Sequence, residues 1–104
     1  MEDSRVEALL QMMARDPNDR AVHYMLGNEY FKAQKYSEAV EILHRYLQSG
    51  DDEGSAYRLL AKSQERLGRI EEARQAYREG IVAAERHGHQ PMVEEYTQAL
   101  TDLE

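Results

Sequence analysis

The chain contains no cysteine among its 104 residues. A disulfide framework, a thiol nucleophile and a zinc site built from cysteine are therefore excluded. No apolar run approaches the roughly 20 residues that a membrane-spanning helix needs. A glycine-rich phosphate-binding loop is also lacking, and the N-terminus has no basic segment followed by an apolar stretch, as a secretory signal would have. We therefore expect a cytoplasmic protein.

Basic residues are outnumbered by acidic ones. The chain has 13 Lys and Arg against 20 Asp and Glu, a net charge of −7, and an isoelectric point near 5.1. Because such a protein is repelled by phosphate backbones and anionic lipid surfaces, we expect neither nucleic acid nor membrane as partner. Hydrophobic residues make up 41% and charged residues 32%, which is typical of a folded chain. The length predicts a single domain over residues 1–104.

Apolar residues recur at intervals of three and four along most of the chain, which is the pattern of amphipathic helices. Val22, Leu26 and Tyr30, for example, fall on one helix face. Helices are predicted over residues 4–15, 20–33, 38–48, 53–67, 71–87 and 91–103. No segment alternates apolar and polar residues as a half-buried strand would. The predicted fold class is therefore all-α, with about six helices and antiparallel neighbours.

Residues that favour helix ends separate these segments. Four residues are predicted to begin or cap helices at their N-termini: Ser4, Asp19, Ser37 and Asp52. Gly50 is a predicted left-handed C-cap, and Gly68 and Gly88 are predicted to end the next helices. Pro91 suits the first turn of the last helix.

A sequence signature recurs at a spacing of 34 residues. Between residues 20–53 and 54–87, three pairs are identical at this spacing: Leu26 and Leu60, Glu38 and Glu72, and Ala39 and Ala73. Paired amphipathic helices with this period resemble the tetratricopeptide repeat (TPR). The resemblance implies a first repeat over 20–53 and a second over 54–87. It also implies an N-terminal helix (4–15) like the second helix of a preceding repeat, and a capping helix (91–103) over the open end.

The resemblance implies a short right-handed α-solenoid built from TPR-type helix hairpins. Small residues stand where the family brings two helix backbones close together: Gly27, Ala39, Ala61, Ala73 and Gly80. They allow neighbouring large side chains to interlock at native packing density. The chain departs from the family pattern at Gln64, where an aromatic residue is usual, and at Tyr46, where a small residue is usual.

The first helix of each repeat lines a concave groove in this family. Carried over by position, the resemblance implies a peptide-binding groove formed by Tyr24, Asn28, Phe31 and Lys32 from the first repeat and by Arg58, Lys62, Glu65 and Arg66 from the second. Asn28 matches one position of the carboxylate clamp in the family's chaperone-binding members. Tyr24 and Leu59, however, replace a Lys and an Asn of that clamp.

The charges of the second repeat single out the same face without reference to the family. Arg58, Lys62 and Arg66 recur every four residues and so stack along one helix face, where like charges disfavour the helix by about 0.2–0.5 kcal/mol per pair. In an acidic chain this row predicts binding of an acidic or C-terminal peptide through charge-assisted hydrogen bonds. The alternative is a solvated helix face, on which Glu65 offsets the charges of Lys62 and Arg69.

No arrangement of residues predicts catalysis, a cofactor or a metal site. His87-Gly88-His89 has no third metal ligand assigned to it and is interpreted as a helix-terminal loop. The pairs Glu71-Glu72 and Glu94-Glu95 are interpreted as helix starts, where acid favours the positive end of the dipole.

The sequence thus predicts a non-catalytic module that binds a protein or peptide partner, as an adaptor, a co-chaperone-like protein or an assembly factor. The alternative is a structural module that self-associates through its terminal helices. Residues after Gly88 include four acidic residues and no Lys or Arg. This acidic end could pair with the basic row either within one chain or in a homodimer.

Overall fold

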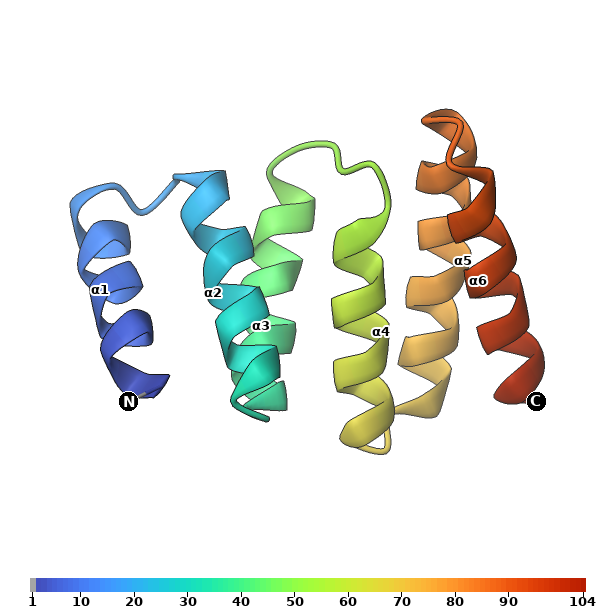
Figure 1. Cartoon of the computed structure of the whole chain (residues 1–104), viewed down its shortest axis with the longest axis horizontal. Coiled ribbons are helices and arrows are strands. Elements are labelled where there is room, and N and C mark those ends of the chain that lie inside the picture. The colour runs from blue at the N-terminus through green and yellow to red at the C-terminus, as the bar shows by residue number, and fades with distance from the viewer. Residues whose placement is uncertain (1) are drawn as a thin grey trace.

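The computed structural model describes residues 2–104, and their side chains from residue 4 onward. Its helices are α1 (Glu2–Arg15), α2 (Arg20–Lys32), α3 (Tyr36–Gln48), α4 (Ser55–Arg66), α5 (Ile70–Arg86) and α6 (Gln90–Asp102). No strand occurs in this part of the chain. The helices succeed one another along the longest axis of the molecule, from α1 at one end to α5 and α6 at the other (Figure 1). The predicted all-α fold is confirmed.

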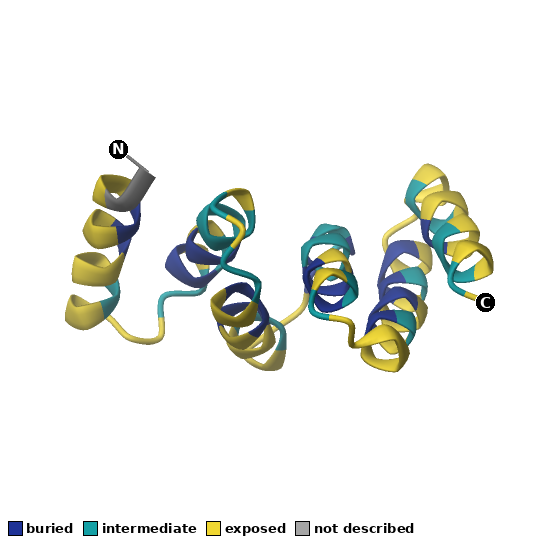
Figure 2. Ribbon diagram, turned by 90° about the horizontal axis from the view of Figure 1, so that it is seen from below, coloured by how far each residue is buried: buried dark blue, intermediate teal, exposed yellow. Residues whose placement is uncertain are grey.

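Each helix packs against the next in sequence, and α2 also contacts α4 directly. Figure 2 shows α2, α4 and α6 along one side of the molecule and α3 and α5 along the other. Two successive hairpins, α2 with α3 and α4 with α5, therefore stack side by side. This arrangement is a short α-solenoid, with α1 and α6 covering its two ends.

Small residues set the distance between the packed helices. Gly27 lies so close to the fully buried Leu43 that a Cβ on the glycine would stand 2.5 Å from the leucine Cδ2. At Gly80 a Cβ would stand 2.7 Å from Cε2 of Tyr96. The three predicted small alanines are also fully buried: Ala39, Ala61 and Ala73. A Cβ at Gly27 or Gly80 would lie closer to its neighbour than Cβ atoms essentially ever do. The close packing of the helices therefore depends on these small residues.

Several predicted helix ends are confirmed. The Asp19 carboxylate caps α2 by accepting a hydrogen bond from the amide of Ala21 at 3.0 Å. Gly68 and Gly88 follow the last residues of α4 and α5 with left-handed φ values of 76° and 73°. Pro91 lies in the first turn of α6.

Three other predicted ends are wrong. Ser4 lies inside α1, because that helix already begins at Glu2. Ser37 lies inside α3, because the tight turn after α2 leads straight into the helix and makes Lys35 its N-cap. Gly50 is not left-handed, because the longer loop before α4 places its positive φ at Gly54.

Asp52 caps α4 from a position ahead of the helix. The helix begins at Ser55, but one carboxylate oxygen of Asp52 accepts from the amides of Gly54 and Ala56, at 2.8 and 3.1 Å. Its other oxygen accepts a 2.7 Å hydrogen bond from the hydroxyl of Tyr46. The tyrosine that replaces a usual small residue thereby joins α3 to the start of α4.

Candidate functional site

The eight predicted groove residues all lie on α2 and α4, which contact each other. We call the surface that they form the α2/α4 face: Tyr24, Asn28, Phe31 and Lys32 from α2, and Arg58, Lys62, Glu65 and Arg66 from α4. Lys32, Lys62 and Arg66 are exposed, and the other five side chains are partly buried. The predicted residues therefore lie on two neighbouring helices.

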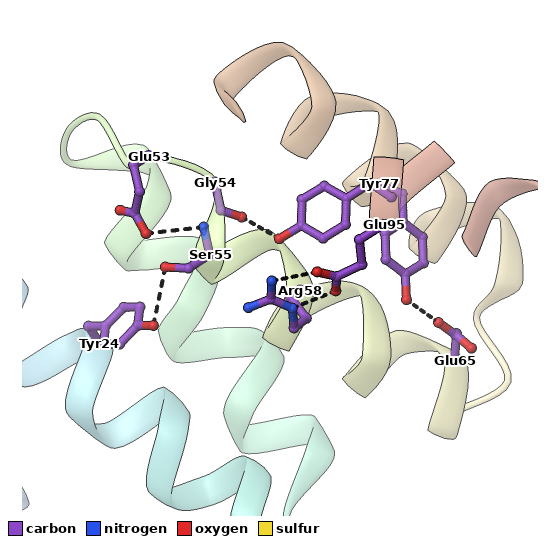
Figure 3. A network of polar contacts seen from close by, with 9 residues as sticks. Tyr24, Glu53, Gly54, Ser55, Arg58, Glu65, Tyr77 and Glu95 are labelled. Carbon is purple, nitrogen blue, oxygen red and sulfur yellow. Dashed lines mark hydrogen bonds and ion pairs between the residues drawn. The ribbon is translucent and has the colours of Figure 1, made fainter. Parts of the chain in front are cut away.

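An ion pair between Arg58 and Glu95 of α6 lies at one edge of this face. The guanidinium donates from Nε and Nη2 to both carboxylate oxygens, at 2.6 and 2.7 Å (Figure 3). The side chains are 35% and 41% exposed. These hydrogen bonds, together with the charges of Arg58 and then Lys62, hold the pKa of Glu95 below its usual range. Arg58 therefore binds a carboxylate in bidentate geometry within the chain itself.

The other α4 residues of this face differ in their exposure and in what they contact. Lys62 is exposed, and its charge acts on the Glu95 carboxylate. Glu65 turns toward α5 and accepts a 2.5 Å hydrogen bond from the hydroxyl of Tyr77. This contact, added to burial, raises the pKa of Tyr77. The Glu65 carboxylate is thus bound by a buried tyrosine of α5.

Aromatic side chains lie at both ends of the α2/α4 face. Near Arg58, the Tyr24 hydroxyl lies 3.3 Å from the Ser55 Oγ (Figure 3), and the Tyr24 ring packs edge-on against Tyr46 with centroids 5.3 Å apart. At the opposite end, Phe31 packs edge-on against another ring at 5.8 Å.

The ring that contacts Phe31 belongs to Tyr36 of α3, and the guanidinium carbon of Arg66 lies 5.8 Å from its centre. Lys32, beside this cluster, forms a 3.2 Å ion pair with Glu29. Tyr36 is not among the predicted groove residues, because it belongs to the second helix of its hairpin. Asn28 lies between the two aromatic ends, one turn after Tyr24.

Glu95 is the main residue whose role was predicted wrongly. The interpretation of Glu94-Glu95 as a helix start is wrong, because α6 begins at Gln90 and has no acidic residue in its first turn. Glu71-Glu72 do lie in the first turn of α5, as predicted. The acidic character of the last helix indicated an interaction with the basic row, but the residue that makes it depends on how α6 is rotated against α5.

The His87-Gly88-His89 segment forms a helix-terminal turn, as predicted. The Nε2 atom of His87 lies 2.7 Å from a carboxylate oxygen of Asp51. Within the part of the chain that the structure describes, no group of three or more His, Cys, Asp or Glu side chains could hold a metal ion. None of the described helices is both long and apolar enough to cross a membrane.

Comparison with known proteins identifies the family. The tetratricopeptide repeat profile matches residues 24–87, which is more than half of the chain. The chain belongs to the tetratricopeptide repeat family. It is 28% identical over 99 residues to "TPR repeat-containing protein PA0015" of Pseudomonas aeruginosa, an alignment that covers 95% of this chain and 94% of the relative.

Solved TPR-like structures have the same architecture. The solution structure of protein BPP2914 from Bordetella parapertussis superposes with a TM-score of 0.78 at 28% identity, covering 94% of this chain and 85% of that one. A structure of MamA superposes with a TM-score of 0.71 at 20% identity, covering 98% and 67% of the two chains. The second likeness concerns the fold alone. The repeats of this TPR protein indicate a protein–protein interaction module, in a family whose members are generally non-catalytic.

Proposed function

We propose that this TPR protein binds its partner through an acidic or C-terminal peptide held on the α2/α4 face. The observation that supports this most directly is the bidentate contact from Arg58 to a carboxylate at 2.6 and 2.7 Å. Bidentate Arg–carboxylate pairs are the strong and orientation-specific form of a charge-assisted hydrogen bond. The position therefore already has the geometry that recognition of a peptide carboxylate requires.

Each part of the face has its own role in this proposal. Arg58 and Lys62 bind carboxylates of the peptide, and the Asn28 amide binds its backbone. Tyr24 and Phe31 contact apolar parts of the peptide. The rings are partly buried against neighbouring tyrosines, so they lose little conformational entropy when a ligand binds. An adaptor or assembly factor, including one that acts like a co-chaperone, would use such a face to hold another protein.

The partner can be sought by affinity capture with the whole chain as bait. A genuine ligand of the α2/α4 face is retained by the wild type and by Arg78→Ala, which removes an exposed charge from α5. It is lost with the double variant Arg58→Ala/Lys62→Ala. Calorimetry with the captured peptide should then show roughly a tenfold loss for Arg58→Ala or Lys62→Ala, as expected for one well-placed charge-assisted hydrogen bond. Equal binding by all variants would place the contact surface elsewhere.

Self-association is the second candidate function. Leu10 and Met12 on the terminal helix α1 are 38% and 43% exposed, and exposed apolar side chains at the end of a solenoid favour contact with a second copy. The pairing of Glu95 with Arg58 inside one chain, in contrast, occupies part of the acidic surface that a homodimer would use. Light scattering across a range of concentrations tests this candidate, and a constant monomer mass excludes it.

A further inference from the structure

The C-terminal helix α6 is anchored by Tyr96. This side chain is fully buried, and its ring packs into the space that Gly80 leaves on α5. The Tyr96 hydroxyl donates a 2.6 Å hydrogen bond to the backbone carbonyl of Gly54, at the start of α4. These contacts fix the position of α6 against both α4 and α5 without any contribution from Glu95.

Glu95 directly precedes Tyr96 on this anchored helix, and its side chain contacts Arg58 of α4. Its carboxylate accepts from Nε and Nη2, so both donors on that edge of the guanidinium are occupied. The Arg58 guanidinium carbon also lies 5.8 Å from the centre of the Tyr96 ring. A peptide carboxylate that approaches this edge of Arg58 therefore finds both donors already bound to another carboxylate.

We propose that Glu95 is a built-in competitor of the ligand at Arg58. This inference rests on the proposed peptide-binding function and adds a regulation of the same site. Glu95 is 41% exposed, and Tyr96 holds α6 in place, so only the side chain of Glu95 has to rotate when a ligand carboxylate takes over the guanidinium. The exchange leaves the fold unchanged.

The competition also selects the kind of ligand. Because a ligand carboxylate has to displace Glu95 from Arg58, a peptide with a single acidic group gains less affinity from this contact than it would at an unoccupied arginine. A second acidic group can reach Lys62, which lies one turn further along α4 and is exposed. The site therefore favours peptides with at least two carboxylates, such as an acidic residue followed by a free C-terminus.

The test measures fluorescence anisotropy with a labelled peptide of alternating Asp and Glu and a free C-terminal carboxylate. Glu95→Gln should bind this probe about three- to fivefold more tightly than the wild type, because a partly exposed ion pair contributes that much to the competition. Glu94→Gln removes the same charge from an exposed neighbouring position of α6 and should change affinity less than about 1.5-fold. Glu95→Asp keeps the charge but is too short for the bidentate contact, so it should also bind more tightly than the wild type.

The coupling to Arg58 completes the test. In an Arg58→Gln background, Glu95→Gln should not increase the affinity for the peptide, since Glu95 then has no arginine to occupy. Far-UV circular dichroism of each variant verifies that the helices are retained. Equal gains from Glu95→Gln and Glu94→Gln, or a gain that persists without Arg58, would overturn the inference and leave the peptide-binding proposal standing. If neither the wild type nor Glu95→Gln binds the probe, both are wrong.

Discussion

Gln34 and Gly68 occupy the same left-handed position in two turns that lie 34 residues apart. Their φ angles are 62° and 76°, and each directly follows the C-cap residue of its helix. In both turns the amide of the next residue donates a 2.8 Å hydrogen bond to the carbonyl five residues earlier. This is the hydrogen-bond pattern of a Schellman motif. Gln34 therefore adopts a left-handed backbone conformation at a position where the second turn has a glycine.

Replacing Gln34 by glycine should stabilise the protein. A residue with a Cβ loses about 1–2 kcal/mol in the left-handed region, while glycine adds about 0.5–1 kcal/mol of backbone entropy to the cost of folding. We therefore expect Gln34→Gly to raise the free energy of unfolding by about 0.5–1 kcal/mol, measured from urea denaturation midpoints with an unchanged slope.

The matched control is Gly68→Ala. A Cβ at Gly68 would meet no atom within 4 Å, so any loss of stability comes from the backbone angle alone. The strain of about 1–2 kcal/mol, less the backbone entropy of about 0.5–1 kcal/mol that alanine saves, leaves an expected loss of about 0.5–1 kcal/mol. Unchanged stability in both variants would mean that these turns relax to other angles in solution.

Gly27→Ala should destabilise the protein by about 1–3 kcal/mol, the usual range for overpacking. The added methyl group would stand 2.5 Å from the Cδ2 and 2.7 Å from the Cγ of Leu43, which is fully buried. Shortening that neighbour should relieve the clash, so Gly27→Ala should cost less in a Leu43→Val background. Denaturation of the two single variants and the double variant measures this coupling. Strictly additive losses would contradict the direct contact.

The arrangement of the helices could be predicted from the sequence more accurately than the residues at which they begin and end. The period of 34 residues and the buried small residues located the hairpins, because both follow from repeated local patterns. Ser37 and Gly50 were assigned wrongly because cap preference is weak and the length of the connection decides where a helix starts. A turn of three residues makes Lys35 the N-cap of α3, whereas the loop before α4 lets Asp52 cap that helix from a distance.

The candidate site could be predicted only in part. The spacing of Arg58, Lys62 and Arg66 fixed their common face, since all three lie on one helix. The partner of Arg58 could not be identified in the same way, because it comes from a different helix. Its identity depends on the burial of Tyr96 against Gly80, which turns Glu95 rather than Glu94 toward α4.

Alkaline titration should unfold the protein together with ionisation of its buried tyrosines. Burial, and then a hydrogen bond to a carboxylate, raise the pKa of Tyr46 and Tyr77, and burial raises that of Tyr96. Because the fold favours their neutral form, their contribution to stability is complete below pH 10.0, the ordinary value, and is lost as the pH rises above it. The part of the tyrosinate absorbance that comes from these three residues should therefore rise late and cooperatively, together with loss of helical circular dichroism. In urea, all seven tyrosines should titrate in one phase.

Acid should remove the contribution of the Arg58–Glu95 pair to stability. The hydrogen bond from Arg58 lowers the pKa of Glu95 below 4.5, so the charged form is favoured in the folded state. That contribution is present above the unfolded pKa and disappears as the pH falls through the folded one. Since both side chains are more than a third exposed, Glu95→Gln should reduce the free energy of unfolding by only about 0.2–1 kcal/mol at pH 7. The difference from wild type, measured by urea denaturation, should shrink steadily as the pH falls below 4.5, whereas Glu94→Gln should match the wild type more closely throughout. A loss with Glu95→Gln that stays the same as the pH falls would mean that packing of the side chain, and not the ion pair, connects α6 to α4.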